Sequence, residues 1–61
     1  MAINSIFVRS KNFTGTLTVN ITVFHGHRVT KIVQRPSGAF EVHHTGSYKP
    51  WVFAASQVEI V

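Results

Sequence analysis

The sequence predicts a small all-β domain, a single barrel of five to six short antiparallel strands. Three observations support this fold class. Residues 16–24 alternate apolar and polar side chains, short clusters that contain Gly or Pro recur along the chain, and no segment has the periodicity of a long helix. Because 61 residues suffice for one domain only, we expect residues 1–61 to form a single unit.

The clearest expected strand covers residues 16–24. Leu17, Val19, Ile21 and Val23 occupy its odd positions, and polar residues occupy most of the others. Side chains alternate between the two faces of a strand, so this pattern predicts one buried face and one exposed face.

The remaining segments give shorter strands. We expect them at residues 3–9, 28–35, 39–44, 48–53 and 58–61. Ile6 and Val8 lie on one face of the first. In the strand expected at residues 28–35, the adjacent apolar residues Ile32 and Val33 break the alternation and indicate a bulge or burial on both faces.

Turn residues separate these strands. Lys11 to Gly15 is expected to be a connection, His25-Gly26-His27 a turn or bulge, Pro36-Ser37-Gly38 a tight turn, and Thr45-Gly46-Ser47 another. Pro50 cannot donate a ladder hydrogen bond, which places it at an edge or a bulge. The small and polar residues Ala54 to Gln57 favour one short 3-10 turn near the C-terminus.

The charge balance indicates an anionic partner. Six Lys and Arg residues face two acids, Glu41 and Glu59, and the net charge is +4. Nucleic acid and an acidic protein surface are both compatible with it, although such a charge also keeps a small protein soluble. The chain has no cysteine, no apolar run long enough for a membrane helix and no secretory signal at residues 1–5. We therefore expect a cytoplasmic protein without disulfides or membrane contact.

Residues 40–61 resemble the second half of an SH3-like barrel, in which a hairpin is followed by one 3-10 turn and a closing strand. Similar spacing occurs in KOW-type domains, Sm-like proteins and type II dihydrofolate reductases. The resemblance implies an SH3-like fold and no particular function. The run that lines the pore of the reductases has no equivalent in Trp51-Val52-Phe53, and the N-terminal helix of Sm-like proteins is missing.

Basic and aromatic residues give the leading functional hypothesis, a non-catalytic module that binds nucleic acid. Small barrels bind single strands with cations that contact phosphates and aromatic rings that stack on bases. The candidate site residues are Arg9, Lys11, Arg28, Lys31, Arg35, Lys49, Tyr48 and Trp51. Phe7 and Phe13 are further stacking candidates, but most of the phenylalanines, which include Phe24, Phe40 and Phe53, must form the core. The hypothesis requires the six cations to share a face with Tyr48 or Trp51.

Four histidines form two pairs, His25 with His27 and His43 with His44. The first pair could point to one side of a strand, whereas His43 and His44 must point to opposite sides. No thiolate exists and no carboxylate lies near the first pair, so we expect no metal site and no cofactor.

Enzymatic motifs are scarce. Glu41 and Glu59 are the only carboxylates and fall in different expected strands, and no serine lies in a nucleophile motif. We therefore expect no catalytic residues, while an active site formed only at the interface of a homo-oligomer stays open.

A second hypothesis is a protein-interaction module, such as a factor encoded by a phage or plasmid that modulates a host protein. It requires an exposed apolar patch or an unpaired strand edge. It also predicts binding that responds weakly to salt.

Overall fold

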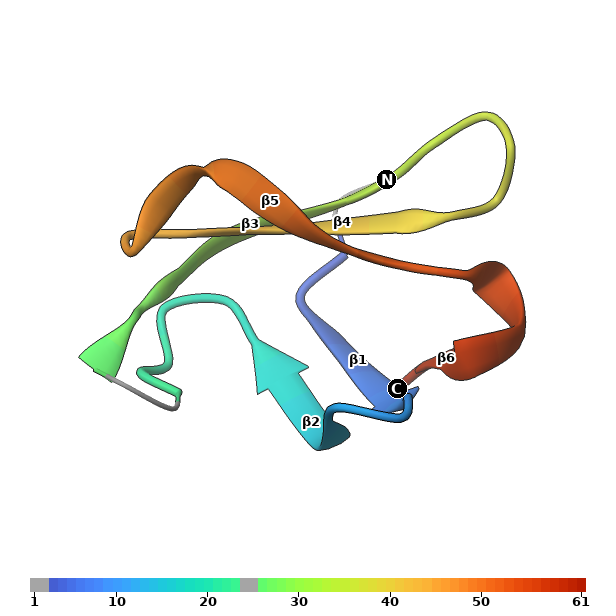
Figure 1. The fold of residues 1–61 in the computed structure, drawn as a ribbon, viewed down its shortest axis with the longest axis horizontal. Coiled ribbons are helices and arrows are strands. Elements are labelled where there is room, and N and C mark those ends of the chain that lie inside the picture. Colours follow the sequence, from blue (N-terminus) through green and yellow to red (C-terminus); the bar gives the residue numbers. More distant parts are fainter. Residues whose placement is uncertain (1–2, 24–25) are drawn as a thin grey trace.

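The computed structural model describes residues 3–23 and 26–61. In this part of the chain, six strands form two antiparallel sheets of three strands each, in the orders β2-β1-β6 and β3-β4-β5 (Figure 1). The strands are β1 (Ser5–Arg9), β2 (Thr14–Thr18), β3 (Val29–Gln34), β4 (Phe40–His44), β5 (Ser47–Phe53) and β6 (Val58–Ile60). A 3-10 turn over Ala55–Gln57 precedes β6, as the sequence predicts. The all-β prediction is confirmed.

The strand expected at residues 16–24 is shorter than predicted, because β2 begins at Thr14 and ends at Thr18. Asn20 has a φ of 71°, a conformation that asparagine tolerates better than most residues. The turn is closed by the amide of Ile21, which donates to the carbonyl oxygen of Thr18 at 3.1 Å. Ile21 is therefore 53% exposed and does not join the core.

Two hairpins agree with the predicted turns, whereas the connection expected over Lys11 to Gly15 is shorter, because β2 begins at Thr14. At Pro36-Ser37-Gly38, the amide of Gly38 donates to the carbonyl of Arg35, and Gly38 has a positive φ of 99°. The second hairpin turns at residues 45–46, since His44 faces Ser47 in the ladder. Of the predicted turn at residues 25–27, His25 lies outside the described residues, and the amide of Gly26 donates to the carbonyl of Val23.

One of the two predicted irregularities occurs, at Pro50, whereas the bulge or two-sided burial expected at Ile32 and Val33 was predicted wrongly. The register of β3 against β4 shifts between Val29 and Lys31 rather than at Ile32 and Val33. Ile32 is buried and Val33 is exposed, so ordinary alternation explains that pair. Pro50 lies on the edge strand β5, opposite a second register shift in β4, as its missing amide hydrogen predicts.

Residues from both sheets form one core. Its buried members are Ile6, Val8, Leu17, Val29, Ile32, Phe40 and Val42. Ile6 and Val8 of β1 alternate with less buried neighbours, and so do Phe40 and Val42 of β4. Because each sheet alone would leave one apolar face in water, the packing of β1 and β2 against β3 and β4 stabilises both sheets. Phe13 and Phe53 pack at the margin of this core, and Phe24 lies outside the described residues.

The two sheets meet at one corner without a closed ladder among the described residues. Ile3 forms an isolated bridge with Ile32. The amide of Asn20 donates to the carbonyl of Val29, and the amide of Val29 donates to the carbonyl of Ile21. The structure therefore has two open sheets where one barrel was expected. Within residues 3–23 and 26–61, no helix has the length and apolarity needed to cross a membrane.

Candidate nucleic-acid interface

All six predicted cations are exposed, and the structure divides them into two groups. Arg9 forms an ion pair with Glu59 at 3.3 Å and lies over the ring of Phe7, with 5.3 Å from Cζ to the ring centroid. Arg35 forms an ion pair with Glu41. Glu41 and Glu59 are the only acidic side chains of the chain. No side-chain carboxylate therefore remains to pair with the other four cations, which are Lys11, Arg28, Lys31 and Lys49.

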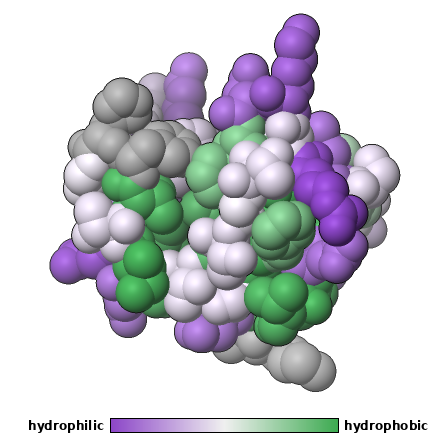
Figure 2. Space-filling view, turned by 90° about the horizontal axis from the view of Figure 1, so that it is seen from below, coloured by the Kyte–Doolittle hydropathy of each residue, from purple (hydrophilic) through white to green (hydrophobic). Residues whose placement is uncertain are grey.

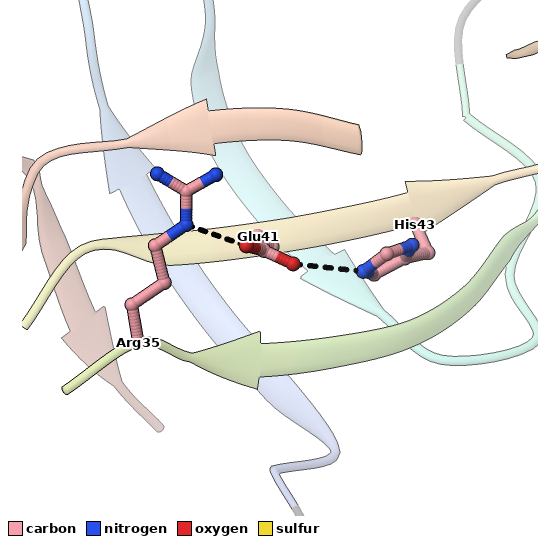
Figure 3. Close-up of polar contacts among 3 residues, drawn as sticks. All are labelled: Arg35, Glu41 and His43. Atoms are coloured by element: carbon pink, nitrogen blue, oxygen red, sulfur yellow. Dashed lines mark hydrogen bonds and ion pairs between the residues drawn. The ribbon is translucent and has the colours of Figure 1, made fainter. Parts of the chain in front are cut away.

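Glu41 of β4 lies between the side chains of Arg35 and His43 (Figure 3). Arg35 donates from Nε to one carboxylate oxygen, and Nε2 of His43 lies 3.0 Å from the other. These hydrogen bonds, that with Arg35 first, lower the pKa of Glu41 below its ordinary value. Glu41 is therefore a charged member of a surface network, because both of its oxygens are engaged.

Two of the cations without a carboxylate partner, Lys31 and Lys49, belong to the sheet β3-β4-β5, and Arg28 directly precedes β3. Lys31 of β3 faces His43 of β4 in the ladder. Residues 48–50 of β5 bulge outward opposite the same histidine, and β5 curves strongly there (Figure 1). Arg28 is held at this end, because its amide and carbonyl both hydrogen-bond with Thr45 at 3.0 Å.

We call this region the hairpin-end surface and define it by Arg28, Lys31, Tyr48 and Lys49. Tyr48 is 88% exposed. Arg9 and Lys11 belong to the other sheet and its β1–β2 turn, and Arg35 lies at the opposite end of β3. The six cations therefore do not share one face, although Lys31 and Lys49 lie on one sheet with the exposed tyrosine and Arg28 directly precedes it.

Trp51 lies beneath this surface in a stack of rings. The imidazole of His44 lies 3.7 Å from the Trp51 ring, centroid to centroid, at 13° between planes. The His27 ring lies beside this pair, 5.5 Å from His44 and 6.2 Å from Trp51. Gly46 leaves room for the stack, because a Cβ at that position would overlap the His27 ring. Trp51 is half-buried. Because His44 stacks on one face of its ring, that face is not open to a base.

His44 is the buried polar residue of the described core and is kept neutral by its surroundings. Its Nδ1 accepts from the amide of Gly46 at 3.2 Å. Burial, and next the nearby imidazole of His27, lower the pKa of His44 below its ordinary value of 6.5. The Lys49 backbone opposes this shift, but Nε2 of His44 has no hydrogen bond of good geometry within the described part of the chain.

Acidification should therefore destabilise the fold. Below pH 6.5 the unfolded chain binds a proton at residue 44 more readily than the native protein, so the free energy of unfolding should fall as the pH decreases from about 7 to about 5. A second decrease should follow below pH 4.5, where protonation removes the charge of Glu41. Urea unfolding at a series of pH values measures both decreases.

The variant His44→Phe keeps an aromatic ring in the stack and removes the titration. It should flatten the stability curve between pH 7 and 5 while leaving the decrease below pH 4.5. An unchanged slope in this variant, or a wild-type protein that becomes more stable at pH 5, would contradict the assignment to His44.

The histidines do not form a metal-ligand set in the described residues. His43 contacts Glu41 on one side of β4, whereas His44 and His27 stack with Trp51 on the other. No group of three or more potential ligands lies together in the part of the chain that the structure describes. His25 lies outside it.

The two carboxylates are also separate from each other. Glu41 lies on β4 and Glu59 on β6, in different sheets, and each contacts an arginine. In this arrangement they do not face a common site.

Two features of the surface were missed by sequence reasoning. His43 contacts Glu41 and faces Lys31, and its position on the same strand face as Glu41, two residues away, could have revealed the first contact. The ion pair of Arg9 and Glu59 joins β1 to β6, and no local signal predicts that pairing.

Comparisons with protein-family models, with curated proteins and with solved structures give no match to this chain.

Proposed function

We propose that the protein binds single-stranded nucleic acid through the hairpin-end surface. One observation supports this most strongly: Lys31 and Lys49 lie on one sheet with a tyrosine that is 88% exposed, Arg28 directly precedes that sheet, and both acids of the chain are engaged elsewhere. Cations that contact phosphates, combined with an aromatic ring that stacks on a base, form the usual binding surface for single strands.

The electrostatics favour an anionic ligand at this position. Glu41 is engaged by Arg35 and His43, and Glu59 by Arg9, so neither is left to neutralise Lys31 or Lys49. Phosphate groups would supply the missing negative charge, and release of their counterions would add to the affinity.

Tyr48 supplies the stacking ring in this proposal. A base inside a duplex is already stacked on both faces, so an exposed ring at a hairpin favours an unpaired base. Trp51 has a supporting role, because its contact with His44 holds β5 beside the hairpin. Arg9, Lys11 and Arg35 contribute to the general positive field rather than to direct contacts.

The finer fold assignment is also a proposal: we infer that the two sheets are the halves of an SH3-like barrel. The 3-10 turn between β5 and β6 supports it. So do the bridge between Ile3 and Ile32 and the hydrogen bonds of Val29 with Asn20 and Ile21, which join the sheets at one corner.

The salt dependence of binding tests the phosphate contacts. Each contact with a single strand contributes about −0.7 to the slope of log affinity against log salt. Lys31→Gln and Lys49→Gln should each weaken binding and make the slope less negative by about that amount. Fluorescence polarisation of a labelled single-stranded oligonucleotide, in DNA and RNA versions, measures both quantities.

Lys11→Gln is the matched control. It removes one exposed lysine from the other sheet and should leave the slope within about 0.2 of the wild-type value if the contacts are local. Equal effects of all three substitutions would show that only net charge matters and would contradict a defined surface.

A further inference from the structure

An open groove of about 840 Å³ runs along β3 and shares Lys31 with the hairpin-end surface. Residues 30–34 of β3, an edge strand of its sheet, form one wall, and Ile3, Asn4, Val19 and Ile60 line the rest. The lining residues used in the proposal below are Ile3, Val19, Lys31, Ile32, Val33 and Ile60. This volume falls in the range of clefts that bind ligands, about 300–1,000 Å³.

The groove combines apolar walls with one cation. Val33 is 39% exposed and Ile60 is 60% exposed, so both present apolar surface to solvent. Apolar patches also reach the surface on the side of β1, β2 and β6, where they are set among polar side chains (Figure 2). Lys31 is the charged residue of the lining, and the acids Glu41 and Glu59 contact Arg35 and Arg9 instead.

We propose that this groove binds an extended segment of an acidic partner protein, in which apolar and acidic side chains alternate. The apolar side chains would pack between Val33 and Ile60, and a carboxylate would pair with Lys31. Extended segments commonly bind along sheet edges, where pockets select alternate side chains. This interaction goes beyond the proposed nucleic-acid binding and uses a different part of the surface, apart from Lys31.

A second copy of this chain fits the groove poorly. In a two-fold arrangement this patch would meet its own copy, and its lining contains no acidic side chain to pair with Lys31. The chain also has only two carboxylate side chains, and both are engaged in ion pairs. In this proposal an acidic segment of a different protein supplies the counter-charge.

A short peptide tests this proposal on the intact protein. The probe is a capped peptide of about six residues, the usual length of a strand, with valine and glutamate alternating. Titration into ¹⁵N-labelled protein should shift the amide signals of residues 30–34 and 60, and the same peptide with lysine in place of glutamate should not bind. Lys31→Glu should reverse this preference.

Val33→Ser should weaken the peptide affinity by about tenfold, whereas Val52→Ser should leave it within about twofold. The two valines are matched, because both are exposed and both lie opposite Glu41 in the ladder, on β3 and β5 respectively. Tyr48→Ala should leave the peptide affinity unchanged, and Val33→Ser should leave oligonucleotide affinity unchanged, so either proposal can fail alone.

Equal effects of Val33→Ser and Val52→Ser, equal binding of the lysine peptide, or an absence of amide shifts would overturn the proposal. So would shifts of residues 30–34 that grow with protein concentration without peptide, which would make a second copy the occupant. Displacement of the peptide by an oligonucleotide that shifts the same groove signals would show that nucleic acid occupies the groove instead.

Discussion

Replacing Tyr48 with alanine should weaken binding of a single-stranded oligonucleotide by roughly 5- to 150-fold. Stacking of one base on an aromatic ring contributes about 1–3 kcal/mol when measured by alanine substitution. Tyr48 is 88% exposed, so its side chain contributes little to the packing of the free protein. The substitution should therefore change the free energy of unfolding by no more than about 0.5 kcal/mol. Polarisation titrations and urea unfolding of the same samples separate these two effects.

Tyr48→Phe is the control for this substitution. It keeps the ring and removes the hydroxyl, so its affinity should lie within about threefold of the wild type if stacking dominates. Tyr48→Ala with unchanged affinity would exclude Tyr48 from the interface, and an equally large loss in Tyr48→Phe would assign the effect to the hydroxyl group.

Ile6→Ala should unfold most of the protein or lower its melting temperature by more than about 10 °C. Ile6 is fully buried between the sheets, and truncation of such a residue costs about 2–5 kcal/mol. A chain of this length has a total stability of only roughly 3–9 kcal/mol. Each kcal/mol shifts the midpoint by about 4–8 °C in a small domain. Circular dichroism during heating measures the change.

Ile60→Ala provides a matched control, because Ile60 faces Ile6 in the ladder between β1 and β6. Ile60 is the same residue type but lies at the surface, so its truncation should cost no more than about 0.5 kcal/mol. Similar destabilisation by both substitutions would mean that β1 does not pack its Ile6 face against the second sheet.

Much of the fold could be predicted because local signals agree with it. Gly38 supplies the positive φ that ends one hairpin, Pro50 marks an edge strand, and residues 55–57 form the expected 3-10 turn. These features depend on neighbours in the chain, and local backbone preferences are readable from sequence.

The end of β2 was predicted wrongly for a physical reason. The alternation continues through Val19 and Ile21, but the chain reverses direction at Asn20, which adopts a left-handed conformation. Alternation of apolar and polar residues predicts a strand but does not predict where the strand ends, unless Gly or Pro marks the turn.

The candidate site was only partly predictable. Sequence reasoning lists six cations, but the availability of each depends on pairing between distant strands. Arg9 is engaged because β6 brings Glu59 beside β1, and Trp51 is covered on one face because His44 stacks on it. Lys31 and Lys49 lie on one sheet through the ladders of β4 with β3 and β5.

The central claim is that the hairpin-end surface binds single-stranded nucleic acid. The most direct measurement is the polarisation of a labelled single-stranded oligonucleotide during titration with the wild-type protein, at low and at moderate salt. The account predicts saturable binding that weakens with salt with a slope of about −2, as three phosphate contacts require. An oligonucleotide whose polarisation does not change at low salt would contradict the claim.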